Sequence, residues 1–115
     1  MTDPDCIFCR IVAGDIPAQV IHRDETVIAI ADVNPQAPQH LLVMPFRHFS
    51  NIAEFAESAS PEEVQHLLRL AASLGSREYQ DGYRMVVNTG PAGGQTVGHL
   101  HVHVLAGRHM HWPPG

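Results

Sequence analysis

Three histidines alternate with aliphatic residues near the C-terminal end of the chain. Single aliphatic residues separate His99, His101 and His103, and strand side chains point alternately to opposite faces. The spacing therefore predicts a strand over 99–105 with three imidazoles on one face. Adjacent imidazoles repel one another when charged, which favours neutral nitrogen that attacks electrophiles or ligates metals. We interpret this strand as a nucleophile platform or a metal site.

The two cysteines of the chain, Cys6 and Cys9, have a spacing suited to tetrahedral zinc. Zinc needs two more ligands, so a redox pair and two small buried thiols remain alternatives. The redox alternative expects the pair at the start of a helix after a strand, whereas here it opens the chain. Cysteines this close cannot staple distant parts of a fold, so we expect a reduced, cytoplasmic compartment.

Composition narrows the class of protein. The chain has 115 residues, which predicts one domain over 1–115. Seven Lys and Arg against 12 Asp and Glu give a net charge of −5, which disfavours nucleic-acid binding. No run of 18 apolar residues is present, and the first residues lack the positive charge of a signal peptide. We therefore expect neither a nucleic-acid nor a membrane partner. We expect the functional residues to be among the nine histidines.

The helices are predicted from apolar periodicity and end signals. Apolar residues at helical spacing over 7–12, before Gly14, predict a short N-terminal helix. Ser60, Pro61 and Glu63 predict the start of a long amphipathic helix, which Gly82 would end.

The strands are predicted from β-branched runs and turn residues at 20–22, 26–31, 41–44, 84–88 and 99–105. The first two form a hairpin, and two prolines make 34–38 a loop. This order, with short connections, indicates an α+β domain whose antiparallel sheet carries helices.

The motif His-φ-His-φ-His-φ-φ over His99–Leu105 resembles the signature of the histidine-triad superfamily of nucleotidyl hydrolases and transferases. Further segments resemble its Hint branch, the nucleoside phosphoramidases: Ile16–Ala18, Asn34–Pro38 leading into His40, Gly82–Asn88, Gly93–Gln95 and His109–Gly115. The last segment separates this branch from the diadenosine-polyphosphate hydrolases, which lack it. The resemblance implies an HIT-like fold of five antiparallel strands and two helices, paired as a homodimer with sheets joined across the two-fold axis.

The resemblance also implies the catalytic residues. His101 is expected to attack the phosphorus of a purine nucleoside phosphoramidate, giving a nucleotidyl-histidine that water hydrolyses. His103 would contact the α-phosphate, His40 would manage protons beside the nucleophile, and His99 completes the triad. Thr96 stands where the family usually has serine, and it keeps the hydroxyl.

The same comparison implies a nucleotide site. Asp32 would accept the ribose hydroxyls, since a carboxylate offers two acceptor oxygens. The ribose-phosphate region would contact Asn88, Gly94, Gln95 and Thr96 together with His101 and His103. The apolar slot for the base would be formed by Phe8, Ile16, Ile30 and Val33, although plain core packing is the alternative for each of the four.

The metal set is implied in the same way. Zinc-carrying members of the superfamily share the cysteine pair, and His48 and His99 fit their two histidine positions. Members without the cysteines fold without metal, so the expected zinc is structural. No organic cofactor is expected.

The C-terminal segment 107–115 is expected to reach the partner subunit. There Trp112 would wall the leaving-group side of the substrate, the alternative being a loose, exposed tail. His22, His66 and His109 carry no functional prediction. The rival functions are a dinucleoside-polyphosphate or aminoacyl-adenylate hydrolase, and a zinc-stabilised nucleotide-binding scaffold with incidental activity.

Overall fold

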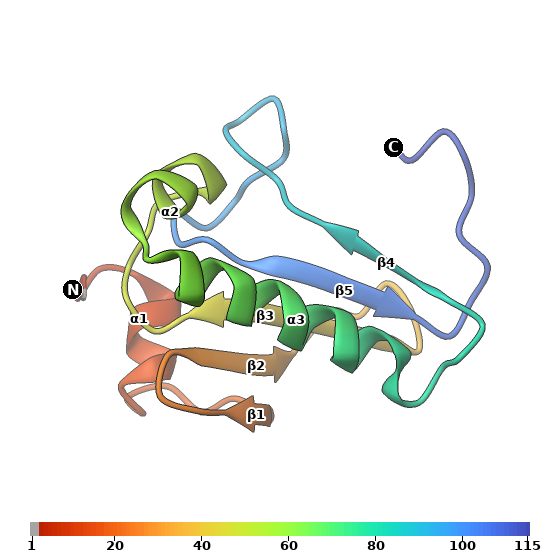
Figure 1. The fold of residues 1–115 in the computed structure, drawn as a ribbon, viewed down its shortest axis with the longest axis horizontal. Helices are drawn as coiled ribbons and strands as arrows, with labels where there is room; N and C mark the ends of the chain where they lie inside the picture. Colours follow the sequence, from red (N-terminus) through yellow and green to blue (C-terminus); the bar gives the residue numbers. More distant parts are fainter. Residues whose placement is uncertain (1–2) are drawn as a thin grey trace.

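Five antiparallel strands form one sheet in the computed structural model, which describes residues 3–115 (Figure 1). The strands are β1 (Val20–Arg23), β2 (Val27–Ala31), β3 (Gln39–Pro45), β4 (Tyr83–Val86) and β5 (Val102–Ala106). Their order is β1-β2-β3-β5-β4, so β5 lies between β3 and β4, and β4 is an edge strand. The predicted α+β class and five-stranded sheet are confirmed.

Three helices occur within the described residues: α1 (Ile7–Val12), α2 (Ile52–Ser58) and α3 (Pro61–Arg77). Helices α1 and α3 were predicted, whereas α2 was not. The missed signal is local, because the Asn51 side chain caps the helix by accepting the Glu54 N–H at 2.9 Å. One turn later Phe55 is buried in the core.

Helix α3 begins as predicted and ends earlier than predicted. The Ser60 and Glu63 side chains form both bonds of a capping box. The helix ends at Arg77, so the prediction that Gly82 ends it was wrong. The Tyr83 ring packs against Gly75 so closely that a Cβ on Gly75 would lie 2.5 Å from ring atoms of Tyr83. The chain must therefore turn back under the last helical turn to bring Tyr83 there. Gly82 allows this turn with a φ of +131°.

The two faces of the sheet bury different clusters. Helix α3 lies across one face (Figure 1), where its apolar stripe of Leu67, Ala71 and Leu74 packs on alternate residues of β2, β3 and β5. The short α1 packs Phe8 and Val12 against the opposite face. Since strand side chains alternate, β2 and β3 contribute residues to both clusters.

Strand β5 begins at Val102, so the prediction of a strand from residue 99 was wrong for its first three residues. In that stretch the Leu100 N–H donates to the carbonyl of Phe49, outside the sheet ladder. His99 and His101 therefore lie in the connection that leads into β5. Strand β4 likewise ends at Val86 and not at residue 88.

None of the helices formed by residues 3–115 combines the length and the apolar composition that crossing a bilayer requires. The homodimer stays a prediction.

Candidate active site and zinc site

Two histidines from neighbouring strands meet on the α1 face of the sheet. His40 lies on β3 and His103 on β5, and the two strands pair directly. His40 Nε2 lies 2.9 Å from His103 Nδ1, and 3.3 Å from Oδ2 of Asp32. The strand pairing itself thus brings together two of the predicted catalytic residues and the predicted ribose acceptor.

The hydrogen-bond partners decide where the protons of this pair lie. The backbone N–H of Gln36 donates to His40 Nδ1 at 3.0 Å, so the proton of neutral His40 is on Nε2. That Nε2–H donates to His103 Nδ1, which leaves the proton of neutral His103 on its own Nε2. His103 therefore has an N–H donor on the side of its ring away from His40.

Both histidines are held neutral. Burial lowers the pKa of His40, opposed by the Asp32 carboxylate. Burial also lowers the pKa of His103 to about 4, with smaller contributions from the charges of His101 and His40. Asp32, His40 and His103 offer ligand atoms within 4.8 Å of one another. A metal there would have to displace the proton on His40 Nε2, which in the neutral ring is donated to His103.

His101 has one nitrogen occupied and one free. Its Nδ1 lies 2.7 Å from the carbonyl oxygen of His99, which can only accept, so Nδ1 carries a proton, and in the neutral ring Nε2 keeps its lone pair. The ring is buried and meets the ring of Phe8 edge to face at 5.0 Å. The His103 ring lies 5.1 Å away. A lone pair on a fixed, neutral imidazole is what nucleophilic attack requires.

The residues predicted to surround the base are only partly brought together. Phe8 and Ile30 are buried in the α1-side cluster, and Ile30 is aligned with Leu42, which pairs with His103 across the sheet. Ile16 is half-buried outside that cluster. Val33 is 99% exposed and contributes no wall within one chain.

The predicted phosphate-side residues lie in the connection between β4 and β5. Asn88 follows Val86, the register partner of His103, by two residues. Gly94 has a φ of +83°, which favours glycine. The side-chain amide of Gln95 is hydrogen-bonded within the chain: its oxygen accepts the Gly90 N–H, and its nitrogen donates to the Ser50 and Val97 carbonyls.

Thr96 is exposed beside the cysteine cluster, in a hollow of about 300 Å³ that it lines with Cys6 and His48. Trp112 is 82% exposed. Its segment is tethered to the sheet edge by Arg84, which donates to the His111 carbonyl at 2.9 Å.

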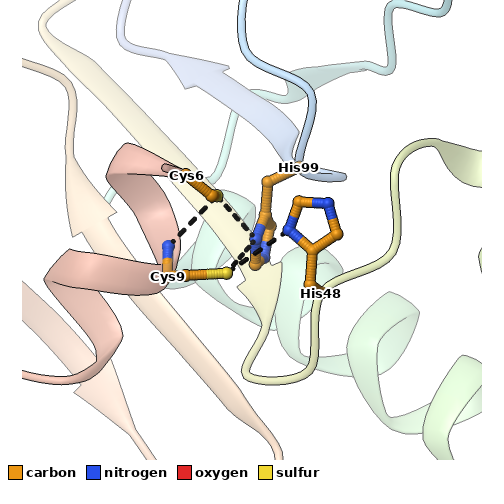
Figure 2. A group of neighbouring side chains, drawn as sticks. All are labelled: Cys6, Cys9, His48 and His99. Atoms are coloured by element: carbon orange, nitrogen blue, oxygen red, sulfur yellow. Dashed lines mark hydrogen bonds between the residues drawn. The ribbon is translucent and has the colours of Figure 1, made fainter. Parts of the chain in front are cut away.

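A second cluster gathers the four predicted metal ligands (Figure 2). Cys6 and Cys9 come from the start of α1, His48 from the segment after β3, and His99 from the connection before β5. The sulfur of Cys9 lies 3.3 Å from His48 Nδ1 and 3.5 Å from His99 Nδ1, and the sulfur of Cys6 lies 3.4 Å from His99 Nδ1. Three segments distant in sequence thus converge on one point.

The donor set fits zinc. His99 Nε2 lies 2.9 Å from the Pro45 carbonyl oxygen, so its proton is there and its Nδ1 lone pair faces the sulfurs. Burial lowers the pKa of His99 to about 4, which keeps this ring neutral. Burial raises the pKa of Cys9, and a cation would offset that cost by holding the thiolate. Two thiols and two imidazoles form a closed tetrahedral set, as in structural sites.

Comparison with known proteins gives the family. The profile described as HIT domain matches residues 13–110. The chain belongs to the HIT family. It is 46% identical to an uncharacterized HIT-like protein of Synechococcus elongatus over 112 residues, which are 96% of this chain and 97% of that protein. A HIT family hydrolase from Legionella pneumophila superposes with a TM-score of 0.91 at 42% identity, covering 96% of this chain and all of that one.

The names of two further HIT relatives mention zinc. A 14 kDa zinc-binding protein of Zea mays is 43% identical, covering all of this chain and 91% of its own. A Zn-bound histidine triad family protein from Mycobacterium smegmatis superposes with a TM-score of 0.77 at 35% identity, over 90% of this chain and 76% of that one. The chain therefore has the fold of HIT family hydrolases, with a Cys₂His₂ cluster.

The sequence did not single out the backbone of Gln36 or the carbonyls of His99 and Pro45, which set the imidazole protons. Backbone groups carry no residue-type signal, so no motif could reveal these three. The prolines around Gln36 were the only hint, because they indicated a fixed loop next to His40.

Proposed function

We propose that this HIT protein hydrolyses the P–N bond of purine nucleoside phosphoramidates, of the AMP-amine or AMP-lysine type, and releases a nucleoside monophosphate. The observation that carries the proposal is the protonation pattern of His101 and His103. One ring keeps a free lone pair at Nε2, while the neighbouring ring keeps an Nε2–H donor. A nucleophile next to a hydrogen-bond donor suits attack on a phosphorus that carries negative oxygens.

In the proposed reaction the His101 Nε2 lone pair forms a bond to phosphorus as the bond from phosphorus to the amine breaks. The amine leaves with a proton, for which the Thr96 hydroxyl is the proposed donor. His103 would donate its Nε2–H to a phosphoryl oxygen, and His40 would hold His103 in that state. Water then attacks phosphorus and gives one proton back to Thr96, the bond from phosphorus to His101 breaks, and the monophosphate is released.

The remaining site residues are proposed to bind the nucleotide. Asp32 would accept the ribose hydroxyls, while Asn88, Gly94 and Gln95 would lie along the ribose-phosphate region. The base would meet Phe8, Ile16, Ile30 and Val33. Trp112 of the partner subunit would face the leaving group in a homodimer.

We propose a structural role for the zinc that Cys6, Cys9, His48 and His99 would hold. The His101 ring hydrogen-bonds the backbone carbonyl of His99 and not its imidazole, and none of the four ligand atoms of the cluster is among the groups proposed to touch substrate. Bound zinc would fix α1, and with it Phe8, against the connection that carries His101.

A kinetic comparison tests the proposal. The values of kcat/KM should be highest for adenosine or guanosine phosphoramidate, lower for diadenosine polyphosphates and aminoacyl adenylates, and negligible for a phosphoramidate without a nucleoside. Faster polyphosphate hydrolysis would favour the rival hydrolase. Nucleotide binding without turnover of any of these compounds would favour the scaffold.

The nucleophile is tested by replacing His101 with alanine. Turnover should vanish while nucleotide binding survives, because binding would draw on Asp32 and the apolar residues as well. In the unchanged chain, a phosphorus label should be trapped on His101 after mildly denaturing alkaline quench. Near-normal turnover of His101→Ala would show that another residue attacks.

A further inference from the structure

The segment after β5 contacts the loop before β3 at two points. Arg108 Nε donates to the Gln36 carbonyl at 2.8 Å. Next to it, Gly107 has a φ of +97°, and a Cβ there would lie 2.8 Å from the Cβ of Pro38. The segment and the loop are therefore in close contact, with no room for a side chain between them.

Gln36 is held through its backbone on both sides. Its N–H donates to His40 Nδ1, and its carbonyl accepts from Arg108. The residue is exposed, and its side chain reaches only the Asn34 carbonyl within the same loop. Burial therefore does not keep this residue in place. Apart from the His40 imidazole, Arg108 is the only side chain outside the loop that hydrogen-bonds Gln36 among the described residues.

We propose that Arg108 is a positioning residue for the proposed reaction, acting through Gln36 on the tautomer of His40. While Gln36 N–H donates to Nδ1, the proton of His40 stays on Nε2 and faces His103. If Gln36 moves away, the proton of His40 can shift to Nδ1, and two lone pairs then face each other across the 2.9 Å contact. His103 relieves that repulsion by moving its own proton to Nδ1, which removes the Nε2–H donor.

The inference rests on the proposed function for its effect on rate, but not for its effect on the histidines. The first measurement is therefore long-range ¹H–¹⁵N NMR of the full chain without substrate, which distinguishes protonated from unprotonated ring nitrogens. The unchanged chain should show His40 as the Nε2–H tautomer. Arg108→Met, which keeps the stem and removes the donors, should move the His40 ¹⁵N shifts toward a tautomer mixture.

The second measurement is turnover of adenosine phosphoramidate. Losing one exposed hydrogen bond should lower kcat of Arg108→Met about threefold to tenfold, with a smaller change in KM. Arg108→Lys retains a donor and should recover part of the loss. Circular dichroism should show the same fold in each variant, and Arg108→Gln provides the same test should Arg108→Met fail to fold.

Arg84→Met is the matched control. Arg84 also donates to a backbone carbonyl of the C-terminal segment, at His111, but makes no hydrogen bond to the 34–38 loop. Its His40 shifts should equal those of the unchanged chain. Unaltered His40 shifts in Arg108→Met, or equal changes in both variants, would overturn the inference. Absence of phosphoramidate turnover in the unchanged chain would instead refute the proposed function and leave the NMR result to decide the role of Arg108.

Discussion

At the scale of single residues, the three triad histidines differ because their partners differ. The His99 Nδ1 faces the cysteines, the His101 Nδ1 faces a carbonyl oxygen, and the His103 Nδ1 accepts from His40. Two of these Nδ1 atoms therefore keep a lone pair, whereas that of His101 carries a proton. One residue type in one repeating pattern is thus held in three different environments, which the proposed function uses as a ligand, a nucleophile and a donor.

His103 should titrate far below an ordinary histidine. Because burial lowers its pKa to about 4, its NMR resonance should show a midpoint near that value, against about 6.5 in an unfolded chain. The Asp32 carboxylate attracts the proton, so Asp32→Asn should lower the midpoint further. A midpoint near 6.5, or an upward shift in Asp32→Asn, would contradict the assigned environment.

The same shift makes stability depend on pH. The unfolded chain takes up the His103 proton below about pH 6.5, whereas the folded chain does so only near pH 4. The contribution of His103 is therefore complete above pH 6.5 and is lost as the pH falls toward 4. Urea unfolding at pH 7 and pH 5 should show a smaller decline for His103→Asn than for the unchanged chain.

At the scale of elements, two helices are attached to the sheet in different ways. Helix α3 has a long apolar stripe and also reaches the β1–β2 turn, where His66 and His22 both contact the Asp24 carboxylate. These hydrogen bonds, with those from two backbone N–H groups, outweigh burial and lower the pKa of Asp24. Helix α1 has six residues and is held by Phe8, Val12 and the cysteine cluster.

The short helix should therefore depend on metal. Purified protein should contain about one zinc per chain by elemental analysis. Cys9→Ser should lower the thermal unfolding midpoint more than it lowers turnover, because the cluster fixes α1 and does not touch substrate in the proposal. Zinc that is absent after preparation without chelators, and does not bind on addition, would refute the four-ligand set.

The long helix should depend on its cap. Ser60→Ala removes the hydroxyl that accepts the Glu63 N–H, and should lower the free energy of unfolding by about 1 kcal/mol. Ser73→Ala is the control, since its exposed hydroxyl bonds only within the helix, to Leu70. Equal changes in the free energy of unfolding for the two variants would show that the Ser60 cap does not stabilise the helix.

At the scale of the whole molecule, β4 is an edge strand and the C-terminal segment runs out beyond it (Figure 1). Unpaired strand edges favour pairing with another chain. A second copy that continued the sheet across a two-fold axis would cover this edge and bring one chain's segment near the other's histidines. The exposed Trp112 would then pack against the second copy.

Deleting Trp112–Gly115 tests this arrangement. The deletion keeps His111, the anchor of Arg84, and should change the ratio of rates for phosphoramidates with bulky and small amines while leaving the nucleobase preference nearly unchanged. Sedimentation should show a dimer with and without the tail. A monomeric unchanged chain, or an unaltered rate ratio, would refute the cross-subunit role.

The sequence alone determined the elements whose signals are local. The capping box at Ser60, the β-branched hairpin strands and the alternation of the histidines are readable because neighbours along the chain produce them. The resemblance of the motifs to the histidine-triad superfamily anticipated the family. Only the tertiary structure decided where α3 ends, where β5 begins and which nitrogen of each imidazole carries the proton. Those depend on Tyr83, Phe49, Pro45 and Gln36, partners brought close by folding whose contacts leave no pattern along the chain.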